Sequence, residues 1–150
     1  MKVSDFMNSP AVTVPSDSSA RQAALRMEDS AVGSLLVESG GRLKGVLTDR
    51  DLVVRCLARG ADPDTPVSEL MSAPATTLDI TDDIAAAYRA FRRSGVRRLP
   101  VLDGHRIVGV LAVDDLLLDV FQHLADLLGP VAWSVLRDPP EPLLASPDRG

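Results

Sequence analysis

Two copies of one heptad carry the side chains of this chain that are best suited to hold a ligand. The first is GVLTDRD, Gly45 to Asp51, and the second is GVLAVDD, Gly109 to Asp115, 64 residues further on. An aspartate carboxylate can accept two hydrogen bonds from the vicinal hydroxyls of a sugar, and a threonine hydroxyl can donate one to a phosphate. Both heptads stand where a strand should end and a helix begin, so free N–H groups would face the same ligand.

The first heptad also has a simpler interpretation, and both can be true together. Thr48 is a good N-cap residue, and Asp51 is a good first-turn carboxylate of a helix. The second heptad has Ala112 at the threonine position, which removes the hydroxyl, and Asp114 at the position of Arg50, which would repel a phosphate. We therefore predict that the two copies are unequal and that Asp51 marks the better ligand site.

The heptads belong to an internal repeat that covers most of the chain. When the sequence is compared with itself at an offset of 64 residues, 18 of the positions from 3 to 52 are identical without a gap. Repeats are supersecondary units that bury their apolar faces by packing on each other. Two such units related by a pseudo-twofold axis would form two related clefts between them.

Each copy has the pattern of a strand, a helix, two strands and a helix. The short segment 11–14 (AVTV) is rich in β-branched residues and predicts a strand. Ala20, Ala24 and Met27 follow with the spacing of one helix face and predict a helix. SLLVE and RLKGVLT, joined by the turn SGGR, predict a β-hairpin, and a helix opened by carboxylates follows. The second copy repeats this order up to Gly129, the expected end of its last helix.

The fold expected from this order is α+β, with two β-α-β-β-α units packed about a pseudo-twofold axis. We place the first unit with its connector at residues 1–64 and the second unit at residues 65–128. The remaining segment, 129–150, is rich in proline, and we expect a C-terminal tail that is largely disordered at its end.

Composition and charge exclude several classes of function. With 45% hydrophobic residues the chain can bury a core, and its net charge of −5 argues against nucleic-acid binding. No apolar run is long enough to cross a membrane, and the N-terminus lacks the pattern of a signal peptide. The one cysteine, Cys56, cannot form an internal disulfide, and we interpret it as a packing residue. These features predict a cytoplasmic protein.

The two copies together resemble a known family, the tandem cystathionine-β-synthase (CBS) domain pair, or Bateman module. The resemblance is carried by VSDFMNSPAVTV and VSELMSAPATTL at the starts of the copies, and by VGSLLVESGGRLKGVLTDRDL and VRRLPVLDGHRIVGVLAVDDL. It covers about residues 1–128. It implies a stand-alone regulatory module that binds an adenosine-containing ligand (AMP, ADP, ATP or S-adenosylmethionine) between the two units. The module would signal to an effector protein in trans, since no enzyme or channel domain is attached.

The resemblance also implies roles for residues of the heptads. In the family, the pattern G-h-h-T/S-x-x-D/N binds the nucleotide. By this resemblance Asp51 would hold the ribose and Thr48 a phosphate, which Arg50 could also reach. In the second copy Asp115 remains available for a ribose, although the threonine contact is lost.

Basic residues at the start of the middle strand commonly meet phosphates in the family, and here they are Arg97 and Arg98. Arginine suits this role because its guanidinium is a planar fork of donors. A solvated strand end is the alternative interpretation of this pair. The adenine would need a mostly apolar slot, for which the candidates, all of them also good core residues, are Val12, Thr13, Leu35, Thr76, Thr77 and Leu99.

Two other classes of function are alternatives to the regulatory nucleotide-binding module. A ligand-independent homodimerisation or scaffold module is one alternative, since pairs in the family commonly form homodimers through their helices. An apolar stripe would serve this, or would pack on the chain's own core; its residues are Leu116, Leu117, Val120, Leu124, Leu127 and Leu128. An enzyme is not expected, because the sequence has no P-loop, catalytic triad order or paired acid–base constellation. No metal or other cofactor is expected to be required, and the nucleotide would act only as a regulatory ligand.

Overall fold

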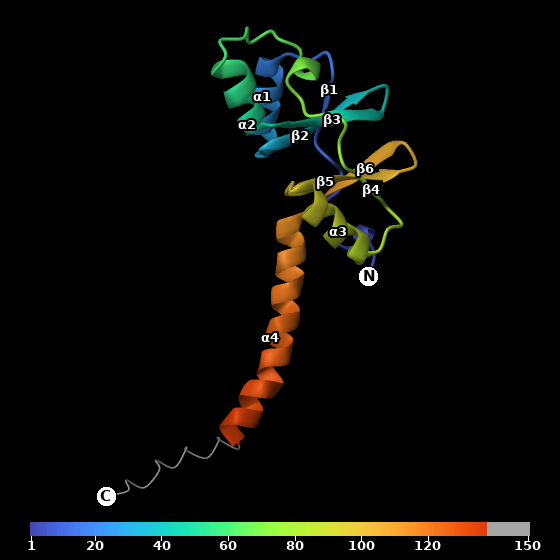
Figure 1. Ribbon diagram of the computed structural model, residues 1–150, viewed down its shortest axis with the longest axis vertical. Coiled ribbons are helices and arrows are strands. Elements are labelled where there is room, and N and C mark those ends of the chain that lie inside the picture. The colour runs from blue at the N-terminus through green and yellow to red at the C-terminus, as the bar shows by residue number, and fades with distance from the viewer. Residues whose placement is uncertain (138–150) are drawn as a thin grey trace, which may run out of the picture. The chain divides into compact units, whose positions relative to one another are not determined.

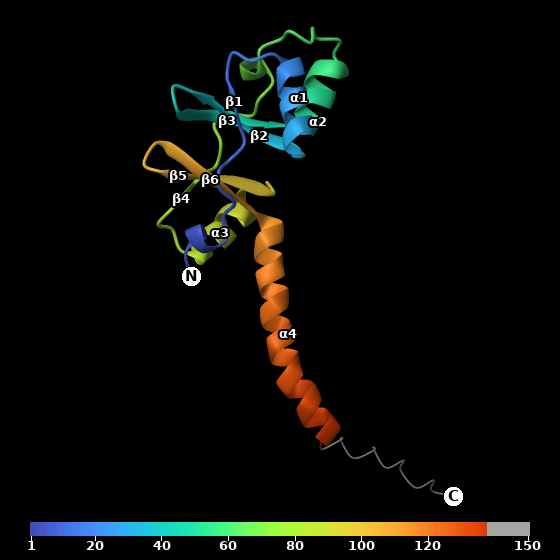
Figure 2. The same ribbon diagram turned by 180° about the vertical axis from the view of Figure 1, so that it is seen from behind.

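The computed structural model describes residues 1–137 of the chain (Figure 1, with the reverse side in Figure 2). These residues belong to two compact units. The first unit is Met1–Asp115 and contains nearly all of both repeats, whereas the second begins at Leu116, within the last helix.

Both copies have the predicted order of a strand, a helix, two strands and a helix, preceded by a short helical turn. The elements of the first copy are η1 (Val3–Asp5), β1 (Thr13–Pro15), α1 (Ala20–Ser30), β2 (Ser34–Ser39), β3 (Arg42–Thr48), α2 (Asp49–Asp51) and the π-helical segment η2 (Leu52–Leu57). Those of the second copy are η3 (Val67–Glu69), β4 (Leu78–Asp79), α3 (Ile84–Ser94), β5 (Arg98–Asp103), β6 (Arg106–Ala112) and α4 (Val113–Arg137). The predicted α+β class is confirmed.

One six-stranded sheet runs through both copies, in the order β1-β2-β3-β6-β5-β4. In each copy the short first strand is parallel to the middle strand, and the middle strand forms an antiparallel hairpin with the last one. The two hairpins lie next to each other in Figures 1 and 2 and pair at Arg42 and Arg106. The register shift after Val37 recurs after Val101, so the copies repeat even this irregularity.

The first residues of each copy pack on the other copy. The N–H of Val3 donates to the carbonyl of Asp82 at 2.9 Å, and the N–H of Val67 donates to the carbonyl of Ser18 at 2.8 Å. Val3 and Val67 are both fully buried. The division of the sequence into 1–64 and 65–128 stays a prediction, and in space each start segment packs on the opposite copy.

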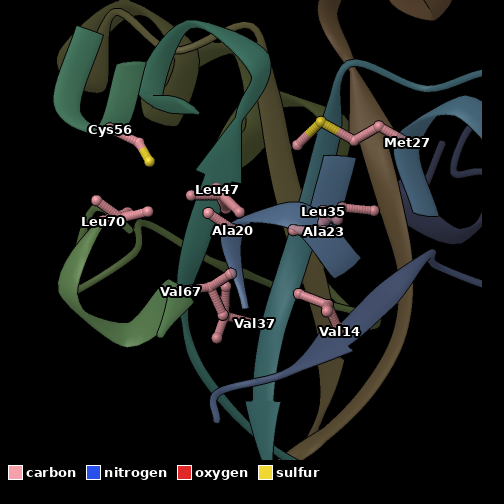
Figure 3. Packing of buried hydrophobic residues seen from close by; sticks show 10 residues of the cluster. All are labelled: Val14, Ala20, Ala23, Met27, Leu35, Val37, Leu47, Cys56, Val67 and Leu70. Carbon is pink, nitrogen blue, oxygen red and sulfur yellow. The ribbon is translucent and has the colours of Figure 1, made fainter. Parts of the chain in front are cut away.

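The core of the first copy joins strand residues, helix residues and the start segment of the second copy (Figure 3). Leu35 and Val37 of β2 are fully buried in it. Val67 and Leu70 come from the second copy and belong to the same cluster. Cys56 lies there too, which confirms its interpretation as a packing residue.

Helix α1 begins at a capping box and turns a slightly different face inward than expected. The Ser19 hydroxyl accepts from the N–H of Gln22 at 3.1 Å, and the Gln22 side chain accepts from the N–H of Ser19 at 3.0 Å. Ala20 and Met27 are buried as expected, but Ala23 is buried in place of Ala24, which is exposed. Both alanines fit an apolar stripe on this helix, so the spacing alone did not distinguish them.

Helix α4 continues past the glycine that was expected to end it. It spans Val113–Arg137 and includes Gly129. A helix ends at a glycine when that glycine takes a positive φ, as Gly60 does, and Gly129 is not among the glycines with positive φ. The expected tail is therefore helical over 129–137, and the rest of that prediction concerns 138–150, which lie outside the described residues. No helix among the described residues is both long and apolar enough to span a membrane.

Candidate ligand-binding site

A cavity of about 360 Å³ lies within the first unit, between residues of the two copies. Its volume falls in the range of small-molecule sites, roughly 300–1,000 Å³. The first copy contributes its start segment, the end of α1 and the beginning of β2. The second copy contributes β5, β6 and the first residues of α4. The lining residues include Asn8, Val12, Leu36, Arg98, Asp114 and Asp115.

The carboxylate of Asp115 is held in place by the first copy. The Asn8 side-chain amide donates to Oδ2 of Asp115 at 2.7 Å. Asn8 is itself fixed by two backbone hydrogen bonds with Val110, of 2.8 and 3.0 Å. Because Asn8 engages one carboxylate oxygen, Oδ1 of Asp115 is left to accept from a ligand.

The close approach of the Asn8 backbone explains the glycine in the second heptad. A Cβ at Gly109 would lie 2.6 Å from the carbonyl oxygen of Asn8 and 3.0 Å from Sδ of Met7. Gly45 has the same relation to Ser72, whose carbonyl oxygen would be 2.6 Å away. Both glycines therefore let a start segment pair closely with the strand.

The side chains of Arg97 and Arg98 have different surroundings. Arg98 lines the cavity, whereas the Arg97 side chain forms an ion pair with Asp114, with Nη2 and Oδ1 3.5 Å apart. Both members of this pair are mostly exposed, so solvent screens it and it contributes little to stability. The ion pair nevertheless offsets the charge of Asp114, which the sequence analysis expected to repel a phosphate.

The strand residue in the apolar part of the cavity wall is Leu36, one position after the expected Leu35. Val12 lies in the wall, as predicted, together with Leu36. Leu35 and Leu99 are fully buried core residues instead. Side chains alternate between the two faces of a strand, so a one-residue error in register moves the assignment to the opposite face. Thr13, the first residue of β1, pairs with Leu36 in the sheet and is half-buried.

Thr76 and Thr77 lie in a different place from the Asp115 cavity. They line a second cavity, also of about 360 Å³, beside α3. Arg89 and Arg93 of α3 and Asp82 complete much of that wall. The two threonines are therefore not brought together with Asp115 and Arg98.

The first heptad forms a reciprocal cap. The Thr48 hydroxyl accepts from the N–H of Asp51 at 3.1 Å, and Oδ2 of Asp51 accepts from the N–H of Thr48 at 2.9 Å. The N-cap role, the simpler interpretation, is thus what these side chains do in this structure. Arg50 is exposed, and Arg55 lies 3.8 Å from the other carboxylate oxygen of Asp51.

Asn8, Leu36 and Arg55 are the residues around the heptads that the sequence analysis missed. The repeat contained a signal for Asn8, because its counterpart Ser72 is also polar and also precedes a proline by two positions. Arg55 had no such signal, since its counterpart is the acidic Asp119.

One carboxylate outside the two cavities, that of Asp79, has a shifted pKa. The Thr81 hydroxyl and the Thr81 N–H both donate to the Asp79 carboxylate and lower the pKa of Asp79 below its ordinary value. Asp79 is the last residue of β4, and it does not line either cavity described above. Within residues 1–137, no three histidine, cysteine or acidic side chains gather as metal ligands would.

Comparison with known proteins gives the same family for both repeats. The CBS domain family model matches the chain twice, at residues 3–57 and 67–121. CBS domain-containing protein YhcV of Bacillus subtilis is 37% identical over 114 residues, which are 76% of this chain and 81% of that protein. Hypoxic response protein 1 of Mycobacterium tuberculosis is 32% identical over 121 residues, 79% of this chain and 85% of that protein.

Solved structures share the fold. The crystal structure of Hypoxic Response Protein I with two coordinated zinc ions has a TM-score of 0.71 at 32% identity and covers 77% of this chain and 96% of its own. CBS domain protein PAE2072 from Pyrobaculum aerophilum, complexed with AMP, has a TM-score of 0.70 at 26% identity, with 77% and 89% covered. The two family matches coincide with the two repeats, and the chain therefore belongs to the CBS domain family, as a tandem CBS pair.

Proposed function

We propose that this chain is a regulatory module that binds an adenine nucleotide in the Asp115 cavity. The observation that carries the proposal is one space lined by an oriented carboxylate, the Arg98 guanidinium and an apolar wall. These three features match the ribose hydroxyls, the phosphate and the base of a nucleotide. The AMP bound to PAE2072, a protein of the same fold, supports this class of ligand.

The proposal moves the preferred site from Asp51 to Asp115. Asp51 already uses Oδ2 in the cap with Thr48 and has Arg55 beside Oδ1. Asp115 has a single neutral amide on one oxygen and borders the cavity. The missing hydroxyl at Ala112 matters less than this difference, because Arg98 provides a stronger phosphate donor.

Isothermal titration of the purified chain with AMP tests the site. Asp115→Ala removes at least one hydrogen bond to a charged group, worth about 1.5–3 kcal/mol, so we expect AMP to bind roughly ten- to a hundredfold more weakly. Asp51→Ala is the matched control and should bind like the wild type. Two further comparisons test the ribose and phosphate contacts separately. The ligand 2′-deoxy-AMP should bind more weakly than AMP, because it lacks one of the hydroxyls that Asp115 would accept from. Arg98→Ala should lower the affinity for AMP but leave the affinity for adenosine, which has no phosphate, unchanged.

Several results would contradict the proposal. Failure of AMP, ADP, ATP and S-adenosylmethionine to bind would remove the nucleotide as ligand. Loss of binding in Asp51→Ala, with normal binding in Asp115→Ala, would return the site to the first copy. If chromatography detected conversion of ATP to a product, the proposal that the chain binds a nucleotide without turning it over would be wrong.

We further propose that the ligand acts by favouring one arrangement of the two copies. The cavity has Asn8 and Leu36 from the first copy and Arg98 from the second, so a bound nucleotide contacts both. A ligand shifts such an equilibrium only through its different affinity for the two arrangements. An effector protein that contacts both copies would then read the shift.

A second candidate function, homodimerisation, is favoured by the composition of α4 after Leu116. Its polar residues Asp119, Gln122, His123 and Asp126 fall on one narrow stripe. Apolar side chains occupy most of the remaining surface, among them Phe121, Leu124, Leu128 and Val131. Such a helix is stable in water only when another apolar surface covers it. Sedimentation equilibrium should show a dimer that Leu124→Glu dissociates, and a wild-type monomer at micromolar concentration would remove this candidate.

A further inference from the structure

The Arg55 side chain connects the first heptad to the start of the second copy. Its Nε lies 3.8 Å from Oδ1 of Asp51. Its Nη1 donates to the carbonyl oxygens of Leu70 and Met71, at 2.9 and 3.0 Å, and its Nη2 lies 3.4 Å from the Ser72 hydroxyl. A single guanidinium thus contacts the carboxylate and three consecutive residues of the segment that faces it.

The second copy has a different arrangement at the corresponding positions. There Asn8 stands in place of Ser72 and reaches the Asp115 carboxylate by itself. Position 119, the counterpart of Arg55, is an aspartate that pairs with His123 four residues later on the same helix, at 3.2 Å. The second heptad therefore meets a neutral amide where the first meets a cation.

The Arg55 contacts oppose a ligand at Asp51. Only 15% of the Asp51 side chain is exposed, and its two oxygens face the Thr48 N–H and Arg55. Ribose hydroxyls are neutral donors and form weaker bonds to a carboxylate than a guanidinium does. A ligand that displaced Arg55 would also leave the carbonyls of Leu70 and Met71 without these donors, at a cost in free energy.

The local backbone supports this placement of Arg55. Asp51 ends α2, and Arg55 lies within the π-helical segment Leu52–Leu57. The Ala58 N–H donates to the Val53 carbonyl at 2.8 Å, five residues back. Single π-helical turns are rare and occur often at functional sites, so Arg55 stands on an unusual part of this helix.

We propose that Arg55 is a built-in occupant of the Asp51 position and limits the module to one nucleotide per chain, bound at Asp115. This inference rests on the proposed function. It makes Arg55 a specificity-determining residue, because Thr48 and Asp51 keep the nucleotide-type pattern while Arg55 takes the place of the ligand. Removal of the guanidinium should expose Asp51 to a second ligand.

Isothermal titration with AMP measures the stoichiometry. The wild type should bind one AMP per chain, and Arg55→Ala should bind two. Arg55→Gln keeps part of the side chain in place and should also bind two, which guards against a folding defect in the alanine variant. Arg59→Ala removes an exposed arginine four residues later and should still bind one. The double variant Arg55→Ala with Asp51→Ala should return to one.

The possible outcomes separate this inference from the proposed function. If the wild type binds one AMP and both Arg55 variants, folded by circular dichroism, also bind one, Arg55 does not exclude a ligand. If the wild type binds two, the inference is wrong while the proposed function stands. If the wild type binds none, the proposed function fails and this inference fails with it.

Discussion

Replacing Gly109 by alanine tests whether the start of the first copy is fixed on the second heptad. The new Cβ would lie 2.6 Å from the Asn8 carbonyl oxygen, a distance that carbon and oxygen do not tolerate. The segment must move away, and the two backbone hydrogen bonds between Asn8 and Val110 are then lost or strained. Each is worth about 0.5–1.5 kcal/mol, and overpacking costs about 1–3 kcal/mol. We expect the free energy of unfolding to fall by about 2–6 kcal/mol.

Urea unfolding followed by circular dichroism measures this loss. Gly45→Ala should be similarly destabilising, because its Cβ would meet the Ser72 carbonyl oxygen at the same distance. Gly129→Ala is the control, since its Cβ would meet no heavy atom within 4 Å apart from the neighbouring backbone of its own helix, and alanine favours a helix over glycine by about 1 kcal/mol. Gly109→Ala within about 0.5 kcal/mol of the wild type, the ordinary range of harmless surface changes, would refute the packing of Asn8 against this strand.

Three further predictions concern single interactions. Thr48→Ala removes the N-cap of α2 and should lower the free energy of unfolding by about 1 kcal/mol in urea, whereas Thr48→Ser should be nearly neutral. Leu99→Ala leaves a cavity at a fully buried position and should cost about 2–5 kcal/mol in the same assay. Thr81→Ala should raise the pKa of Asp79 toward its ordinary value in an NMR titration, because one of the two donors that lower it is lost. Since the folded pKa of Asp79 is lowered, its contribution to stability is present above the ordinary aspartate pKa and is lost as the pH falls through the folded value.

The order of elements could be predicted because each copy repeats the same local signals. Capping residues, the glycine turn and the apolar strands occur at matching positions, and the structure forms the same elements there. Which strand residues face the core was harder to predict, because SLLVE is apolar at three successive positions. Leu35 enters the core and Leu36 lines the cavity, and only the sheet register determines which.

The copy that we propose to bind the nucleotide could not be chosen from the heptads alone. Thr48 indicated a complete motif in the first heptad, and Ala112 indicated a defective motif in the other. The structure adds Arg55, which lies outside the heptad and beside Asp51, and it places Arg98, already a candidate from the sequence, in the cavity that Asp115 lines. Both effects depend on which side chains meet in space, and the motif contains neither residue.

The exchange of start segments explains why the two heptads differ in environment although their sequences are similar. Asn8 belongs to the first copy but sets the environment of Asp115 in the second. Ser72 belongs to the second copy but lies beside Asp51 in the first, where its shorter side chain leaves room for Arg55. We therefore expect a substitution in one start segment to alter the environment of the heptad in the opposite copy. For this reason, each heptad has to be interpreted together with the start segment of the opposite copy, and we expect the two heptads of this chain to differ in ligand binding.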